Sequence, residues 1–343
     1  MKKSIKISLI IIFFVLAAVA VYAYSVYRDI FKSNITNDIY IYIPSNSTYE
    51  DLIDTLQYSK VVIDLSSFQQ TARLKKFGDN IHPGRYKLDS GMTNNQLVNM
   101  FRSGKQSPVK VTFNNIRTIH DLASKACSDI EADSLALVEL LNDESVINEY
   151  GFNMNNIVGM FIPNTYELYW NTSAVEFVEK MKKEYDKFWN EDRIQKAEKI
   201  GLTKQEISVL ASIVQAEQRA HNDEKAKVAG LYINRLNRNM LLQSDPTLIF
   251  ASGDFTKKRV LNRDKEIESP YNTYKYAGLP PGPINMPEIS SIDAVLNYEK
   301  HNYIFMCAKE DFSGYHNFST NAKQHGIYAG RYQQALNKRK IWK

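Results

Sequence analysis

The chain has 343 residues, 44% of them hydrophobic, so it can bury at least one large core, and we expect two domains. This composition excludes a disordered or low-complexity protein. The formal net charge is +5, and Lys2, Lys3 and Lys6 supply three of these charges. The remaining excess is too small to favour nucleic acid as a partner.

The first segment is apolar. Residues 7–27, ISLIIIFFVLAAVAVYAYSVY, carry no charge, and a helix that crosses a bilayer needs about 20 such residues. Because lysines precede it, the positive-inside rule predicts a single-pass anchor in the cytoplasmic (inner) membrane, with residues 29–343 extracytoplasmic. The alternative is a cleaved signal peptide with Ala18-Val19-Ala20 at the cleavage site. We favour an uncleaved anchor with its cytoplasmic tail (1–28), because apolar residues continue to Tyr27.

After a short polar linker (29–37), residues 38–113 are predicted to form a small α/β module. Strands are predicted at 39–43, 84–88 and 109–113. Helices are expected after Thr48, over 67–77 and after Thr93, where Gly104 marks the helix end. This order resembles a LysM-like module, a fold associated with N-acetylglucosamine polymers. Small domains of this kind also serve as spacers or protein contacts, so the order alone does not establish glycan binding.

Residues 114–343 are predicted to form a second, mixed helical and sheet domain, which makes the chain α+β. Thr118 caps the first of several amphipathic helices. The aromatic, proline-containing segment 158–170 cannot be one regular element. Glu167 within it is a candidate acid.

The helix predicted over 203–219 places one acidic side chain on its apolar face. Thr203 and Glu206 form a capping box, and apolar residues then repeat at helical spacing: Ile207, Leu210, Ala211 and Val214. Glu217 continues this stripe, where lost hydration and the negative end of the helix dipole raise the pKa of a carboxyl group. Such a group can act as a general acid. The alternative is that the helix frays before Glu217 and the carboxylate points into water.

Polar and aromatic clusters of the kind that line sugar-binding clefts follow this helix. Asn222-Asp223 is predicted to cap a second helix, and Asp245 before Pro246 is predicted to be an N-cap. A strand over 303–308 leads to the last cluster. The candidate substrate-binding residues are Gln243, Asp245, Asn272, Thr273, Tyr274, His316 and Ser319.

Metal and cofactor signals are missing from the sequence. His316 and His325 have no partners at zinc-ligand spacing, and there is neither a glycine-rich phosphate loop nor a nucleophile elbow. We therefore expect no metal and no cofactor. Cys127 and Cys307 are the only cysteines, and we expect two buried free thiols.

Five blocks, in this order, resemble the signature of the MltG or YceG-like family of endolytic lytic transglycosylases. They are LASIVQAEQ (210–218), LQSDPT (242–247), SPYNTY (269–274), GLPPGPI (278–284) and HNFS (316–319). The resemblance runs from about residue 38 to 335 and implies that Glu217 is the catalytic acid and that 114–343 is the catalytic domain. Many relatives carry a second glutamate where this chain has Gln215, which leaves Glu217 as the only acid on its turn. The block IPNTYELYW also resembles a family block that usually has aspartate where this chain has Asn164, so no acidic role is expected at that position.

The resemblance also implies a reaction. A membrane-anchored enzyme would cleave the β-1,4 bond between N-acetylmuramic acid and N-acetylglucosamine in nascent strands, without water, and so end strand elongation. One glutamic acid would protonate the glycosidic oxygen and then take the proton from the muramic C6 hydroxyl, which closes on C1 as a 1,6-anhydro end. The implied partners are peptidoglycan glycan strands, the membrane and peptidoglycan synthases.

Two other functions remain open. A hydrolytic muramidase needs a second carboxylate, and Asp245 and Glu167 are the candidates. A non-catalytic envelope scaffold would bind glycan through the LysM-like module and recruit synthases. The product distinguishes the three: anhydro ends, reducing ends or no cleavage.

Overall fold

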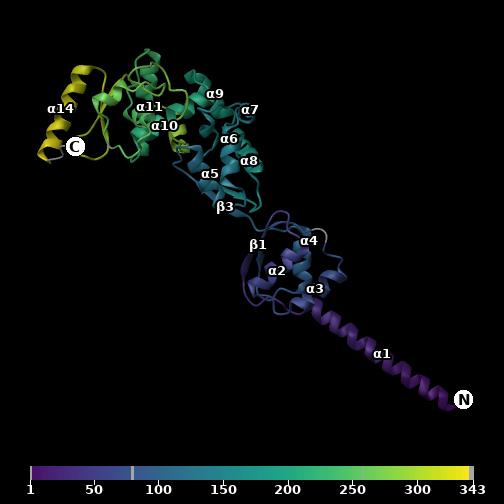
Figure 1. Ribbon diagram of the computed structural model, residues 1–343. Helices are drawn as coiled ribbons and strands as arrows, with labels where there is room; N and C mark the ends of the chain where they lie inside the picture. Colours follow the sequence, from purple (N-terminus) through teal and green to yellow (C-terminus); the bar gives the residue numbers. More distant parts are fainter. Residues whose placement is uncertain (1, 79–80, 258, 340–343) are drawn as a thin grey trace. The chain divides into compact units, whose positions relative to one another are not determined.

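The computed structural model describes residues 2–78, 81–257 and 259–339 (Figure 1). It divides into two compact units. The first comprises Met1–Val111, Asp129–Glu131 and Glu167–Thr172, and the second comprises Thr112–Ser128, Ala132–Tyr166 and Ser173–Lys343. Helices and short two-stranded sheets occur together along the chain, which confirms the expected mixed helix and sheet class.

The chain begins with a long helix, α1 (Lys2–Phe31). By length and composition, its segment Ile5–Phe31 could cross a membrane, and the apolar part is not buried against the protein. A signal sequence has the same properties. An apolar surface of this size is unfavourable in water. A membrane would cover it whether the helix is a permanent anchor or a signal sequence.

The first unit is built on an antiparallel strand pair. In β1 (Ile39–Ile43) and β2 (Gly84–Leu88), Ile39 lies opposite Leu88 and Ile43 opposite Gly84, with bounds as predicted. Alternation along β1 buries Ile41 and Ile43 and turns the intervening tyrosines outward. Three helices share this core: α2 (Tyr49–Ser59), α3 (Leu65–Leu74) and α4 (Asn94–Ser103).

Local capping sets the ends of these helices. The helices begin after Thr48 and Thr93 and α4 ends at Gly104, as predicted. Thr48 and Thr93 each form a capping box, and Gly104 adopts the left-handed conformation. The expected start of α3 at residue 67 was wrong, because the Asp64 side chain accepts the Ser67 backbone N–H and starts the helix at Leu65.

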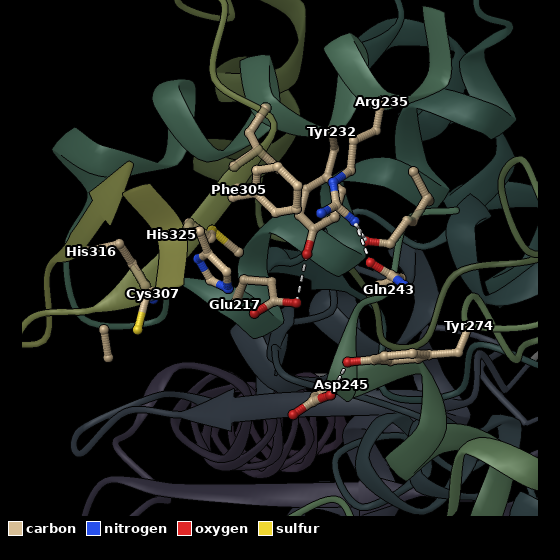
Figure 2. Close-up of a pocket in the computed structure, with 14 residues that line it drawn as sticks. Glu217, Tyr232, Arg235, Gln243, Asp245, Tyr274, Phe305, Cys307, His316 and His325 are labelled. Atoms are coloured by element: carbon tan, nitrogen blue, oxygen red, sulfur yellow. Dashed lines mark hydrogen bonds between the residues drawn. The ribbon is translucent and has the colours of Figure 1, made fainter. Parts of the chain in front are cut away.

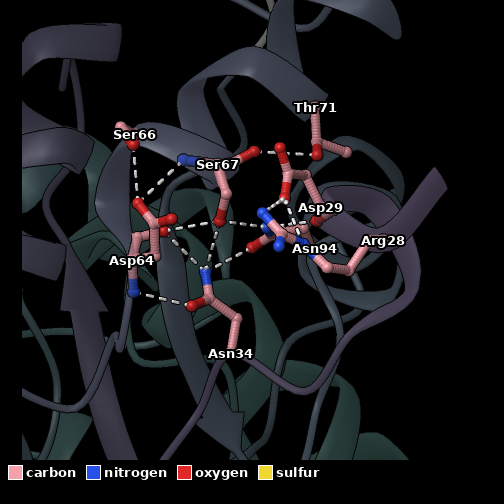
Figure 3. Close-up of polar contacts among 8 residues, drawn as sticks. All are labelled: Arg28, Asp29, Asn34, Asp64, Ser66, Ser67, Thr71 and Asn94. Atoms are coloured by element: carbon pink, nitrogen blue, oxygen red, sulfur yellow. Dashed lines mark hydrogen bonds and ion pairs between the residues drawn. The ribbon is translucent and has the colours of Figure 1, made fainter. Parts of the chain in front are cut away.

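Residues 29–37, expected to be a linker, are joined to the first unit by a buried polar cluster (Figure 3). Asn94 Nδ2 donates to Asp29 O in the last turn of α1, at 2.8 Å. Asn34 Nδ2 donates to Asn94 Oδ1 at 2.6 Å, and Asn34 Oδ1 accepts the Asp64 backbone N–H at 2.7 Å. Both asparagines are buried. The segment therefore continues from the helix into the core of the first unit. These buried contacts attach it there, so it is not a free tether.

Short helices and one further strand pair follow. β3 (Val109–Phe113) pairs with β4 (Asn164–Leu168). The segment 158–170 contains the end of a 3-10 helix (Ile157–Met160) and β4, which confirms that it is not one regular element. The helices of this region are α5 (Ile119–Cys127), α6 (Ser134–Asn142), α7 (Glu144–Glu149), α8 (Ala174–Phe188) and α9 (Glu191–Ile200).

The second unit is centred on α10 (Lys204–Glu217), in which every residue from 207 to 215 is buried. Around it pack α9, α11 (Asn222–Asn237), α12 (Asp245–Ser252) and α13 (Ile289–Leu296). The predicted cap of α11 was wrong by one residue. His221 occupies the cap position and makes no side-chain capping bond, and Asn222 is already helical.

The C-terminal part contributes an antiparallel pair and a last helix. β5 (Phe305–Ala308) pairs with β6 (His316–Ser319), and α14 (Ala322–Lys338) packs on both strands. The strand expected from residue 303 begins two residues later. A 3-10 helix (Asn262–Glu266) lies before the proline-rich loop. Cys127 and Cys307 are both free thiols and only half-buried.

Candidate active site

A cavity of about 490 Å³ lies at the end of α10 (Figure 2). Its walls come from α10, α11, the start of α12, the loop at residue 274 and β5, β6 and α14. Polar lining residues include Glu217, Tyr232, Arg235, Gln243, Asp245, Tyr274 and His316. The cavity thus collects side chains that are far apart in the sequence.

Glu217 is the last residue of α10. The helix does not fray before it, because the Gln218 N–H still donates to Val214 O at 2.9 Å. Glu217 Oε1 accepts two hydroxyl bonds, from Tyr232 at 2.7 Å and from Ser244 at 2.6 Å. Both bonds end on the same oxygen. Oε2 is therefore the oxygen available to exchange a proton with a bound molecule.

The surroundings of Glu217 favour its protonated form. Burial raises the pKa of this carboxyl group and is the largest effect, and the negative charge of Asp245 acts in the same direction. The hydroxyls of Ser244 and Tyr232, and a positive charge on His316, act to lower the pKa. The net shift is upward, which is the direction expected for a general acid.

Asp245 and Tyr274 form a second polar pair in the cavity. The Tyr274 hydroxyl donates to Asp245 Oδ1 at 2.5 Å. Burial, followed by the bond to Asp245, raises the pKa of Tyr274, so the phenol remains a donor. The predicted N-cap role of Asp245 was wrong. Ser244 occupies the cap position and directs its hydroxyl to Glu217, and Asp245 is the first helical residue.

Arg235 holds one wall of the cavity in place. Its Nε donates to Ile304 O at 2.7 Å, and Nη1 donates to Leu241 O and Leu242 O at 2.9 Å and to Gln243 Oε1 at 3.2 Å. Gln243 has a positive φ of 52°, an unfavourable conformation for a residue with a side chain. The guanidinium group therefore stabilises a strained segment that presents Gln243 to the cavity.

Three other predicted binding residues do not line the cavity. Asn272 is fully buried and donates to Lys265 O and Ile267 O, which shapes the loop before Tyr274. Thr273 Oγ1 accepts the Ser244 N–H at 3.0 Å. Ser319 is buried in β6. Gln243, Asp245, Tyr274 and His316 are the predicted binding residues that the structure brings together with Glu217.

The other predicted acid and the neighbouring glutamine lie outside the cavity lining. Glu167 is exposed on β4. Gln215 is buried, and its Oε1 accepts the Glu288 backbone N–H at 2.6 Å, just before α13. Gln215 therefore connects α10 to α13.

Sequence reasoning missed Tyr232, Ser244 and Arg235. Tyr232 lies on an apolar face of α11, where the pattern predicts a buried core residue. Only the packing of α11 on α10 brings its hydroxyl to Glu217. Ser244 lies beside the aspartate that was assigned the cap, which concealed its role. In the described ranges, no group of three or more His, Cys, Asp or Glu side chains is arranged to hold a metal ion.

Comparison with known proteins places the chain in a family. Residues 41–330 match the model of the YceG-like family. An endolytic murein transglycosylase of Bacillus subtilis (strain 168) is 28% identical over 316 residues, covering 87% of this chain and 86% of the relative. One of Streptococcus pneumoniae serotype 2 (strain D39) is 26% identical over 298 residues, covering 78% of this chain but 53% of the relative.

A crystal structure of a yceG-like protein from Listeria monocytogenes shares the fold. Its TM-score is 0.56 at 27% sequence identity, and the match covers 85% of this chain and 98% of that one. The family model covers well over half of the sequence. The chain therefore belongs to the YceG-like family.

Proposed function

We propose that this protein is a membrane-anchored endolytic lytic transglycosylase of peptidoglycan. The observation that carries the proposal is a protonatable Glu217 at the wall of a cavity, with two hydroxyl donors on one of its oxygens. The name of the Bacillus relative, which this chain matches over most of both lengths, supports the same activity.

The proposed first step uses Glu217 as an acid. Oε2–H gives its proton to the oxygen between N-acetylmuramic acid and N-acetylglucosamine, and the bond from that oxygen to muramic C1 breaks. The negative charge that forms on Glu217 is stabilised by the Tyr232 and Ser244 hydroxyls, which already point at Oε1. Donors placed in advance need no reorganisation when charge develops.

The proposed second step uses the same residue as a base. The Glu217 carboxylate takes the proton from the muramic C6 hydroxyl, and O6 forms the new bond to C1. This closes the 1,6-anhydro ring and returns Glu217 to its protonated state. No water enters the balance, and the attacking hydroxyl belongs to the same sugar, which gives an intramolecular advantage.

Substrate contacts are assigned to both units. We assign the sugar contacts in the cavity to Gln243, Asp245, Tyr274 and His316, which line it with Glu217. The first unit is proposed to be LysM-like, a reading supported by its order β1, α2, α3, β2 and its antiparallel strands. Asn272 and Thr273 would act through the wall residues they hold, and Ser319 through β5, where it lies opposite Phe305.

A hydrolytic muramidase is the second candidate, because one observation favours it. Asp245 lines the same cavity as Glu217, and its charge acts on the Glu217 pKa. A second carboxylate at such a site could activate water or form a covalent intermediate.

Product analysis of Asp245→Asn separates the two enzymes. An asparagine keeps an oxygen that can accept the Tyr274 hydroxyl, so the local structure should survive. If Glu217 works alone, mass spectrometry of digested glycan strands should still show anhydro ends, although formed more slowly. Chiefly hydrated reducing ends from the unsubstituted protein, with a stable but inactive Asp245→Asn variant, would assign a muramidase. An absence of cleavage by the unsubstituted protein would favour the scaffold.

A further inference from the structure

A buried ion-pair geometry holds His316, one of the two histidines that line the cavity with His325. His316 lies on β6, and its side chain is 14% exposed. Its ring Nδ1 is 2.7 Å from Glu224 Oε2, and its backbone N–H donates to Glu224 Oε1 at 2.9 Å. One carboxylate therefore binds both the backbone and the ring of the same residue, which fixes the position and the rotation of the imidazole.

Glu224 is charged in this position. It lies in the first turn of α11, and its side chain is 7% exposed. Burial acts to raise its pKa, but the ring and backbone donors of His316 and the Gln218 amide outweigh it, so the pKa of Glu224 lies below its ordinary value. A carboxylate only accepts hydrogen bonds. His316 Nδ1 therefore carries a proton whether the ring is neutral or charged.

Nε2 is the other nitrogen of the His316 ring. Within the described ranges it has no hydrogen-bond partner, and His316 lines the cavity together with Glu217. A positive charge on His316 lowers the pKa of Glu217, which indicates that the two groups interact electrostatically. Nε2 is thus the ring nitrogen that is free to bind a ligand.

The network also includes the residue that follows Glu217. Gln218 Nε2 donates to Glu224 Oε2 and, at 3.0 Å, to Gly314 O in the turn before β6. Gln218 Oε1 accepts the backbone N–H groups of Ala220 and His221 at 3.1 and 3.0 Å. One set of buried and part-buried hydrogen bonds therefore connects the end of α10, the start of α11 and the turn before β6.

We propose that Glu224 is a positioning residue that fixes the tautomer of His316, so that Nε2 hydrogen-bonds the reacting sugar beside Glu217. This inference rests on the proposed function and deepens it. Both proton transfers stay with Glu217, and His316 keeps its Nδ1 proton throughout. Pairing with a buried carboxylate orients an imidazole and selects its tautomer, as in catalytic triads.

The test compares Glu224→Gln with a matched control on the same helical turn. The Glu224 carboxylate accepts three hydrogen bonds on two oxygens, from the His316 backbone N–H, from His316 Nδ1–H and from Gln218 Nε2. A glutamine has only one acceptor oxygen, so the variant cannot keep all three bonds. Asp223→Asn is the control, because among the described residues the Asp223 side chain accepts a hydrogen bond only from the Tyr315 hydroxyl. It removes the same charge from the same helix end and leaves His316 paired. His316→Gln serves to assign the His316 signals.

The first measurement is independent of activity. In the full-length protein labelled with 15N-histidine, neutral His316 should be the Nδ1–H tautomer, with Nε2 unprotonated. Glu224→Gln should give a mixture of tautomers, and Asp223→Asn should not. Finding the Nε2–H tautomer in the unsubstituted protein, or no change in Glu224→Gln, would overturn the inference even if the protein cleaves glycan as proposed.

The second measurement is the rate and pH dependence of anhydro-end formation. In Glu224→Gln, kcat should fall by about 10- to 100-fold, the equivalent of losing one hydrogen bond to a charged group, and the pH–rate profile should change. Asp223→Asn should keep both. An equal fall in Asp223→Asn, or unchanged kcat in Glu224→Gln, would contradict the positioning role. If the unsubstituted protein forms no anhydro ends, the proposed function fails and the tautomer measurement still decides the inference.

Discussion

Replacing Glu217 by glutamine tests the central residue through two independent quantities. The amide has nearly the shape of the carboxyl group, so its oxygen can keep the Tyr232 and Ser244 hydroxyl bonds, and its nitrogen takes the place of Oε2. That nitrogen cannot deliver or accept the transferred proton. General acid–base catalysis is typically worth about 10²- to 10⁴-fold. Because one residue performs both transfers, we expect a loss toward the upper end.

The same substitution should stabilise the fold at neutral pH. The folded-state pKa of Glu217 is raised by burial, so the folded state binds this proton more tightly than the unfolded chain does. The contribution of Glu217 to stability is therefore full below its unfolded pKa of about 4.3 and is lost as pH rises through the folded pKa. Glutamine has no such loss. Each 1 kcal/mol of difference corresponds to roughly 2–4 °C in Tm for a domain of this size.

The assay is glycan digestion followed by mass spectrometry, with thermal unfolding measured at acidic and at neutral pH. Glu198→Gln is the control, because Glu198 is exposed on α9 and its loss removes a charge without touching the cavity. Glu217→Gln should lose cleavage, and its Tm relative to the unsubstituted protein should increase with pH. Near-normal cleavage would refute the catalytic assignment. A Tm difference that does not change with pH would refute the reasoning about burial.

Two further predictions follow from the packing of α10 and from the N-terminal helix. Gln215→Ala should lower the free energy of unfolding by about 1–3 kcal/mol, because it leaves the Glu288 N–H without its partner, while activity per folded molecule stays within a few fold; a stable but inactive variant would instead give Gln215 a chemical role. A reporter fused to the C-terminal end should be active only where an extracytoplasmic reporter is active, and cytoplasmic activity would contradict both the proposed topology and the cell-wall substrate.

The sequence predicted helix starts well where a side chain hydrogen-bonds to the backbone N–H groups of the helix that it begins. Thr48, Thr93, Thr118 and Thr203 each cap the helix that was predicted to follow them, and each forms a capping box, which was predicted for Thr203 alone. The prediction failed at Asp245, because Ser244 and Asp245 can both start the helix that contains Pro246. Tertiary contacts decided between them. The Ser244 hydroxyl donates to Glu217, and the Asp245 carboxylate accepts from the Tyr274 hydroxyl.

The sequence by itself determined the long apolar helix, the strand bounds of the first unit and the place of Glu217 on the buried stripe of its helix, since these depend on composition and on spacing within one element. Only the tertiary structure decided which groups meet that carboxylate. Tyr232 and Ser244 lie 15 and 27 residues from Glu217, and the pairing of Glu224 with His316 spans 92 residues. No periodicity links residues on different elements, because their distance depends on how helices and strands pack and not on their order in the chain.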